Sequence, residues 1–240
     1  MQLVSEYRPL KVRMAKRQYR CNELYFEQLA SDSAYWVGFI AADGCIHIRR
    51  RHHNNQFMLQ LSAAVADRQH LKTFLRCVKS NHPILDAGKG CLSVQIGSYP
   101  LCVQLEQFGV TPRKSYSLRL VRPADPVLLF SMLRGIVDGD GSFGLYKGSY
   151  RKLKNNGLGR PVVLGRKYVR ISVVGSRNVC EMFKEIFSFG SVSKKAGVFQ
   201  WQTAGAKALS VLHKLYIEYD GVALPRKRDL AVKLLKERVV

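Results

Sequence analysis

One eleven-residue pattern occurs twice in this chain, and it constrains the fold more than any other feature. The copies are Ala34–Gly44, AYWVGFIAADG, and Ser131–Gly141, SMLRGIVDGDG. Each copy predicts an apolar helix that ends on an acid, Asp43 or Asp140, followed by a Gly that we expect to close the helix in the left-handed conformation. A carboxylate at a helix C-terminus is disfavoured by up to about 1 kcal/mol. Two such acids at matching places therefore predict a duplicated chain in which a cation compensates the charge.

Small residues recur at helical spacing inside both copies. Gly38 and Ala42 lie four residues apart on one face of the first helix, and Gly135 and Gly139 repeat that spacing in the second. Such faces let two helix backbones approach closely, so we expect the copies to pack about a pseudo-twofold axis with both acids at one end. Like charges brought together raise each other's pKa, and a shared divalent cation reverses that penalty. The alternative is a plain pair of buried helices capped by Asp-Gly turns; the repetition of the whole pattern favours the metal site.

The two copies resemble the signature of a known family. WVGFIAADG, which ends at Gly44, and LRGIVDGDG, which ends at Gly141, are similar to the nine-residue motif of the LAGLIDADG homing endonucleases in their two-motif, single-chain form. The first copy departs from the motif at Ala41, where the family usually has an acid. The resemblance implies that the metal-binding acids are Asp43 and Asp140, which the departure does not affect.

Charge points to a polyanionic partner. The 240 residues include 39 Lys and Arg against 17 Asp and Glu, a formal net charge of +22. Neutralising phosphates is the main use of such a field, so nucleic acid is the expected partner. A membrane surface is the competitor, but the sequence has no polybasic amphipathic helix and no apolar run of bilayer length. The six cysteines form no C-x-x-C pair, which argues against a zinc module and for reduced, intracellular thiols.

The order of patterns predicts a mixed α+β fold. Each repeat reads helix, two strands, helix, two strands, helix (αββαββα), with a curved antiparallel saddle for DNA and the motif helices at the repeat interface. We divide the chain into a basic N-terminal extension (1–30), a first repeat (31–120), a linker (121–126) and a second repeat (127–240). A short helix is expected at Asn22–Leu29, with Asn22 as its cap.

Two acid-free segments mark the predicted DNA surface. No Asp or Glu occurs from Gly44 through Ala66, or between Asp140 and Glu181. Polar side chains that alternate with apolar ones on strands can read base edges in the major groove, while basic ones contact phosphates. The candidate DNA-binding residues are His47, Arg49, Arg50, Arg51, Gln56, Gln60, Gln95, Lys147, Arg151, Lys152, Lys154, Arg166, Lys167, Arg170, Gln200 and Gln202.

Phosphodiester hydrolysis needs a nucleophilic water and charge relief on the phosphate and the leaving oxygen. Two carboxylates on hard divalent ions can organise these steps, and Mg²⁺ is the natural choice; we expect Mn²⁺ to substitute and Ca²⁺ to bind without supporting cleavage. The resemblance implies that the backbone carbonyls of Ala42 and Gly139 help to bind the metal. It also implies that Lys114 and Lys227 tune water or phosphate, although both lysines could serve phosphate contact only.

The repeat spacing supports these pairings. Lys227 follows Lys114 by 113 residues and Asp140 follows Asp43 by 97, with the extra length falling in the loop at 147–165. Two further matched residues, Asp67 and Ser176, begin equivalent helices and are expected to position water near the metals.

The expected function is therefore a site-specific homing endonuclease that makes a staggered double-strand break in a long target. The alternative is a non-cleaving protein of the same fold, either an intron RNA maturase or a DNA-binding regulator. We expect a monomer that acts on double-stranded DNA, with host intron RNA as the second partner considered and no membrane partner. The expected location is inside the cell with the DNA, and an organelle and a prokaryotic or phage cytoplasm both stay open.

Overall fold

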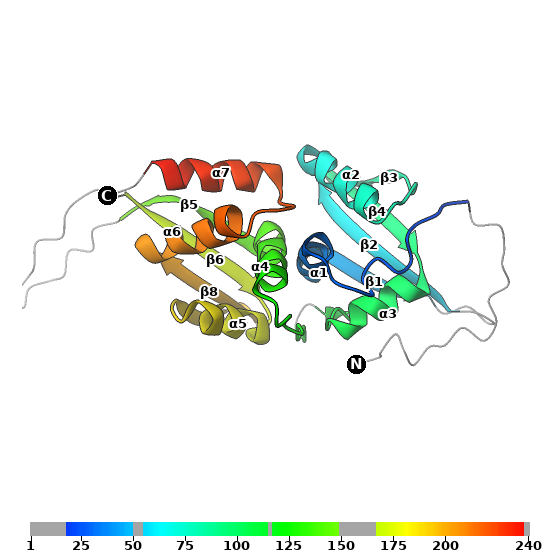
Figure 1. The fold of residues 1–240 in the computed structure, drawn as a ribbon, viewed down its shortest axis with the longest axis horizontal. Helices are drawn as coiled ribbons and strands as arrows, with labels where there is room; N and C mark the ends of the chain where they lie inside the picture. Colours follow the sequence, from blue (N-terminus) through cyan, green and yellow to red (C-terminus); the bar gives the residue numbers. More distant parts are fainter. Residues whose placement is uncertain (1–17, 50–54, 115–116, 149–166, 238–240) are drawn as a thin grey trace, which may run out of the picture.

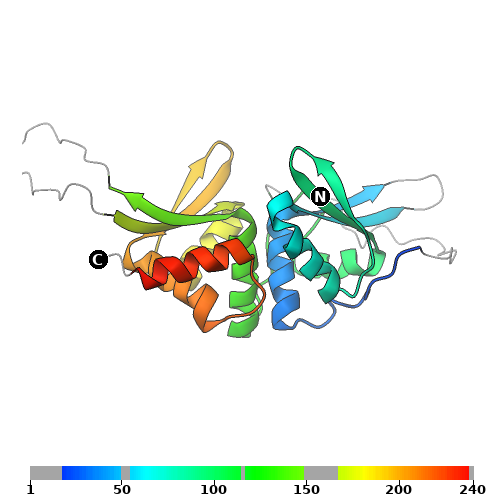
Figure 2. The same cartoon turned by 90° about the horizontal axis from the view of Figure 1, so that it is seen from above.

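The computed structural model describes residues 18–49, 55–114, 117–148 and 167–237. Two similar halves lie side by side, each a four-stranded antiparallel sheet with helices packed on one face (Figures 1 and 2). Their strand orders are equivalent, β1-β2-β4-β3 and β5-β6-β8-β7. The predicted α+β class and the two-repeat arrangement are confirmed.

The elements of both halves follow the predicted order. In the first repeat they are α1 (Ser31–Asp43), β1 (Gly44–Arg49), β2 (Gln56–Ala64), α2 (Arg68–Cys77), β3 (Ile84–Gly88), β4 (Cys91–Gly97) and α3 (Tyr99–Gln107). In the second they are α4 (Pro126–Asp140), β5 (Gly141–Lys147), β6 (Lys167–Gly175), α5 (Arg177–Phe187), β7 (Ser191–Lys195), β8 (Val198–Ala204) and α6 (Ala206–His213), then a π-helical turn (Lys214–Glu218) and α7 (Pro225–Lys236). Among the helices described, none is long and apolar enough to cross a membrane.

The motif helices α1 and α4 pack against each other at the centre of the molecule (Figures 1 and 2). Their backbones approach at the glycines: a Cβ atom on Gly38 would lie 2.0 Å from the carbonyl oxygen of Met132, and one on Gly135 would lie 2.1 Å from that of Tyr35. Real Cβ atoms do not come so close to backbone atoms, so only glycine fits at either position. The predicted small-residue interface between the repeats is therefore present.

The glycines after the motif acids are used differently from the prediction. Gly44 (φ −95°, ψ 164°) and Gly141 (φ −86°, ψ 153°) are extended, so the predicted left-handed closure is wrong. Each helix passes directly into the first strand of its sheet, and this junction needs an extended residue. A Cβ atom there would lie 2.8 Å from the carbonyl oxygen of Ile40, or 2.5 Å from that of Val137, which explains why the position is glycine.

The segment before α1 also differs from the prediction. Residues 23–27 form turns rather than the expected helix. Asn22 caps locally, since its Oδ1 accepts from the Leu24 amide at 3.1 Å, but Phe26 is fully buried and its amide donates to Gln104 on α3 at 3.0 Å. Anchoring to another element replaces the intrahelical hydrogen bonds that a helix would make.

The close approach of the motif helices predicts a stability effect. Gly135→Ala should lower the free energy of unfolding by at least about 1–3 kcal/mol, because the methyl group overlaps the backbone of α1. Gly97→Ala is the control, since the nearest atom to its Cβ is 3.9 Å away, and it should change stability by less than about 0.5 kcal/mol. Urea unfolding measures the stability of both variants. Equal losses of stability would contradict the close backbone contact between α1 and α4.

Candidate active site and nucleic-acid interface

Asp43 and Asp140 are the last residues of α1 and α4, at the same end of the helix pair. Both are exposed, whereas the helix residues before them are largely buried. Asp43 reaches across the interface: a Cβ atom on Gly139 would be 3.3 Å from its Oδ2 and 2.3 Å from the Cβ of Ala42. The structure thus brings together four predicted site residues, the two acids and the residues before them.

The surroundings raise the pKa of both carboxyl groups. Burial of their inner sides is the main cause for each, and the negative charge of Asp43 adds to it for Asp140, whose pKa rises to about 6. Lys227 and Lys114 act in the opposite direction on both acids. Two exposed carboxylates that repel each other form an oxygen-rich site that a hard divalent ion would stabilise.

The described residues contain no group of three or more His, Cys, Asp or Glu side chains that could bind a metal. Magnesium sites do not need one, because they commonly use one or two carboxylates together with water and substrate phosphates. The two acids therefore fit Mg²⁺ as oxygen donors that are completed by DNA and solvent.

The two predicted lysines cap the motif helices. Both are buried, and each donates to the carbonyl oxygen of the glycine that follows its own motif acid: Lys114 Nζ to Gly44 at 2.7 Å and Lys227 Nζ to Gly141 at 2.7 Å. Lys227 also donates to the carbonyls of Val137 and Asp138, at 2.7 and 2.8 Å. Burial lowers the pKa of both lysines. Part of the positive charge predicted at the helix C-termini thus comes from the protein itself.

A buried polar network joins the repeats beside these lysines. Asp138 accepts hydrogen bonds from Tyr35 at 2.8 Å, from Tyr216 at 2.6 Å and from the Leu224 amide at 2.6 Å. Because the Tyr35 hydroxyl donates to Asp138, His70 Nε2, 2.8 Å away, must donate to it. Burial lowers the pKa of His70 to about 4, so that ring is neutral. The network therefore connects α2, α1, α4 and the segment before α7.

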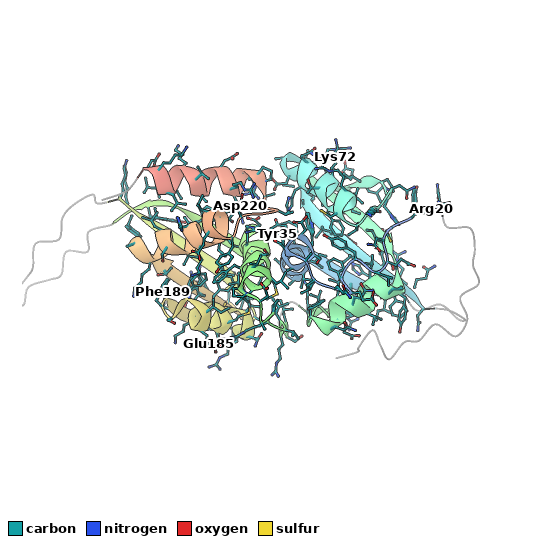
Figure 3. All side chains as sticks on the ribbon, in the orientation of Figure 1. Arg20, Tyr35, Lys72, Glu185, Phe189 and Asp220 are labelled. Atoms are coloured by element: carbon teal, nitrogen blue, oxygen red, sulfur yellow. The ribbon has the colours of Figure 1, made fainter. Side chains whose placement is uncertain are left out.

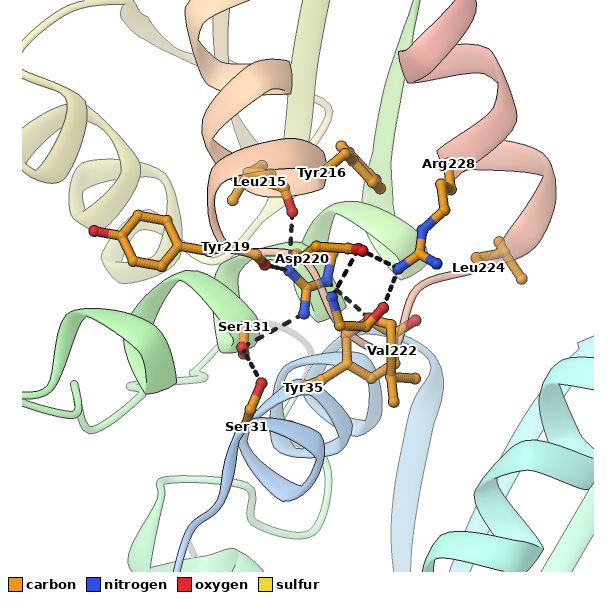
Figure 4. A network of polar contacts seen from close by, with 12 residues as sticks. Ser31, Tyr35, Ser131, Leu215, Tyr216, Tyr219, Asp220, Val222, Leu224 and Arg228 are labelled. Carbon is orange, nitrogen blue, oxygen red and sulfur yellow. Dashed lines mark hydrogen bonds and ion pairs between the residues drawn. The ribbon is translucent and has the colours of Figure 1, made fainter.

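Arg134 supplies the cation of the same network. It is fully buried and donates to the carbonyls of Val222 at 2.7 Å and Leu215 at 2.9 Å, and also to that of Tyr219. Ser131, which accepts from Arg134, is 2.9 Å from Ser31 across the helix pair (Figure 4). These residues were not predicted, although a charged residue inside the apolar motif helix was a signal for them.

The departure from the motif at Ala41 has a matching change across the interface. The offset of 97 residues pairs Ala41 with Asp138 and Tyr35 with Met132. Asp138 and Tyr35 form a buried hydrogen bond, while their counterparts Ala41 and Met132 are both buried and apolar. The lost acid and the lost hydroxyl thus leave no unpaired polar group.

Asp67 and Ser176 are each engaged by protein groups. Arg226 Nε lies 2.9 and 3.1 Å from the two carboxylate oxygens of Asp67, and Nη2 lies 3.0 Å from Oδ2. The Ser176 hydroxyl donates to the Leu118 carbonyl at 2.6 Å and caps α5 by accepting from Val179 at 3.3 Å. Their role in positioning water stays a prediction.

Strand alternation places the DNA-binding candidates of the first sheet on one face. His47 and Arg49 alternate with Ile46 and Ile48 on β1. The register pairs Arg49 with Gln56 and Gln60 with Gln95, so these predicted contacts form adjacent rows on the face opposite the core.

The second sheet separates its candidates. Arg170, Gln200 and Gln202 share the face opposite the core residue Ile171. Lys147 and Lys167 pair with each other at the outer end of β5 and β6. They occupy the alternating strand positions that also carry the core residues, so they do not share the face of Arg170. The remaining candidates lie outside the described residues: Arg50, Arg51, Arg151, Lys152, Lys154 and Arg166.

Two tyrosines, also not predicted, extend the open face of the second sheet. The Arg170 guanidinium lies 3.8 Å above the Tyr146 ring, and the Tyr146 and Tyr168 rings stack at 6.3 Å. The hydrogen bond from Arg170 lowers the pKa of Tyr146. This stack fixes the cation of Arg170 on the uncovered face.

Comparison with known proteins supports the fold. No protein-family model matches the chain, and a comparison with curated proteins finds no match either. Among solved structures, the LAGLIDADG meganuclease I-AabMI bound to uncleaved DNA matches with a TM-score of 0.63 over 87% of this chain and 91% of that one, at 14% identity. I-CpaMI bound to uncleaved DNA gives 0.57 over 88% and 94%, at 12% identity, and I-SmaMI bound to cleaved DNA gives 0.55 over 88% and 91%, at 16% identity. This chain therefore has the fold of those DNA-bound meganucleases.

The raised pKa of Asp140 predicts a pH-dependent stability in the absence of metal. The folded state binds the proton more tightly than the unfolded state, so stability falls as pH rises from about 4 through about 6. Asp140→Asn should therefore raise the melting temperature of the metal-free protein by about 2–4 °C near pH 7.5, allowing for solvent screening. The gain should vanish below about pH 4; a gain that is independent of pH would contradict the assignment.

The unequal hydrogen bonding of the two lysines predicts unequal costs of removing them. Lys227→Met removes three hydrogen bonds to carbonyls at the end of α4 and should lower the free energy of unfolding by about 2–4 kcal/mol, whereas Lys114→Met removes one and should cost about 1–2 kcal/mol. Urea unfolding at neutral pH tests this order. Equal losses of stability, or a larger loss for Lys114→Met, would show that the number of capping hydrogen bonds does not determine the loss.

Proposed function

We propose that this protein is a site-specific, divalent-metal-dependent DNA endonuclease of the LAGLIDADG homing type. One observation carries the proposal: Asp43 and Asp140 end two helices in backbone contact, between two sheets whose polar faces are covered by none of the described helices (Figure 2). The fold neighbours are recorded with uncleaved DNA, with cleaved DNA and, for I-SmaMI, with calcium.

The proposed site divides the work among a few groups. Bound Mg²⁺ would activate a water and relieve charge on the scissile phosphate. Asp43 and Asp140 would bind the metal as ionised carboxylates, with backbone oxygens of Ala42 and Gly139 in support. The capping lysines hold the helix ends in place, so that the acids keep their spacing when DNA arrives. The strand faces would set the register on phosphates and read base edges.

A single chain provides both acids, which favours a monomer as the active unit on double-stranded DNA. The proposed location is inside the cell, where the DNA is. A non-cleaving protein of this fold that binds intron RNA or regulates DNA is the second candidate. The loss of a motif acid would favour this candidate. Because both Asp43 and Asp140 are present, it ranks below the nuclease.

Cleavage of a randomised duplex library with Mg²⁺ tests the proposal. The unaltered protein should make double-strand breaks at a long site, and Asp43→Asn and Asp140→Asn should each reduce the rate by at least about 10²–10³-fold while DNA binding is retained. Mn²⁺ should support cutting, and Ca²⁺ should support binding alone.

Asp86→Asn is a matched control, because Asp86 is an exposed acid on β3 whose carboxylate, within the described residues, accepts only from the Gly88 amide, at 2.7 Å. It should cut normally. Tight, salt-sensitive binding without metal-dependent cutting by the unaltered protein would refute the nuclease and make intron RNA the next ligand to test.

A further inference from the structure

Two basic pairs occupy equivalent places in the repeats. Arg226 and Lys227 follow Arg113 and Lys114 by 113 residues each. The second-repeat pair is committed to the protein: the charge of Arg226 is neutralised by Asp67, and the three ammonium donors of Lys227 serve three backbone carbonyls. Although 57% of the Arg226 side chain is exposed, its charge is already paired, and Lys227 has no ammonium donor left for a ligand.

In the first-repeat pair, most side-chain hydrogen-bond donors have no partner among the described residues. Lys114 donates to one carbonyl, that of Gly44, so two of its three ammonium donors have no protein partner within the described residues. Arg113 is exposed, and in the part of the chain that the structure describes its side chain has neither a hydrogen bond nor an ion pair.

The missing partner of Arg113 has a specific cause. Asp67, which pairs with Arg226, precedes α2, and the residue at the same place before α5 is Ser176. Ser176 carries no charge, and its hydroxyl donates to Leu118. The ion pair therefore forms at one side of the pseudo-twofold axis and cannot form at the other.

Arg113 lies beside the strand that follows the motif acid Asp43. Arg113 lines a cavity of about 790 Å³ together with Cys45 and His47 of β1. These two side chains alternate with buried Ile46, so they belong to the uncovered face of the sheet. β1 begins directly after Asp43, so the wall that this strand gives to the cavity starts beside a candidate metal ligand.

The backbone at Arg113 also differs from that of its counterpart. Arg113 is left-handed, with φ +56°, whereas Arg226 is in the first turn of α7. A left-handed conformation costs free energy for any residue except glycine, and such strain gathers at functional sites.

We propose that Arg113, supported by Lys114, binds a backbone phosphate of the DNA beside the active centre, and that the second repeat has no equivalent contact. This rests on the proposed function in taking DNA as the ligand. A guanidinium whose donors have no partner among the described residues suits bidentate contact with a phosphate. Because the contact occurs at one half only, the two strands of a target are cut at unequal rates.

Binding of the full chain to a mixed-sequence duplex of about 24 base pairs, with Ca²⁺ and over a range of salt concentrations, tests the contact. Arg113→Gln should reduce the slope of log K against log salt concentration by about 0.9, the loss of one phosphate contact, without changing the melting temperature. Arg226→Gln removes the same charge at the counterpart position; it should leave the slope unchanged and lower the melting temperature, because Asp67 loses its partner. An unchanged slope for Arg113→Gln, or an equal loss for both variants, would overturn the proposal.

A duplex labelled on both strands gives the second readout when the protein cuts. Arg113→Gln should slow one strand about tenfold more than the other, the effect of losing one contact in the transition state; equal slowing of both strands would overturn the proposal. If the unaltered protein does not cut at all, the proposed nuclease function fails, and the salt slopes alone decide the role of Arg113.

Discussion

The backbone contact between α1 and α4 is the constraint on which the rest of the structure depends. Glycine at positions 38 and 135 lets each helix meet carbonyl oxygens of the other, so no side chain separates them. This contact brings both helix ends, and hence Asp43 and Asp140, together. Figure 3 shows Tyr35 of α1 where the two halves meet. The buried network of Asp138 and Arg134 stabilises the same interface with directional hydrogen bonds.

Placing two carboxylates at two helix C-termini is electrostatically unfavourable, and the protein compensates it in part. The buried ammonium groups of Lys114 and Lys227 neutralise the helix ends and oppose the rise in pKa of both acids. They do not cancel it, because the pKa of Asp140 still rises to about 6. A site that keeps this residual repulsion in the absence of metal gains free energy when a divalent cation binds.

Much of this arrangement could be predicted from the sequence, because it depends on periodicity and repetition. The matched Gly-x-x-x-small spacing predicted the helix contact, and the alternation of polar and apolar residues predicted that the strands present a polar face, as His47 and Arg49 do on β1. The capping bonds of Lys227 and the pairing of Arg226 with Asp67 join residues 86 to 159 positions apart, and no local pattern encodes such contacts. The extended glycines were missed because a helix that runs directly into a strand needs space at Gly44, not a left-handed turn.

Manganese binding measured by electron paramagnetic resonance, in the presence of a mixed-sequence duplex, tests the central claim most directly. If the paired helices form one metal centre, Asp43→Asn and Asp140→Asn should each remove tightly bound Mn²⁺, and Asp86→Asn should leave it unchanged. Each variant should bind the duplex as the unaltered protein does. Equal Mn²⁺ binding by all four proteins would contradict the account, because the convergence of the two acids would then serve no metal.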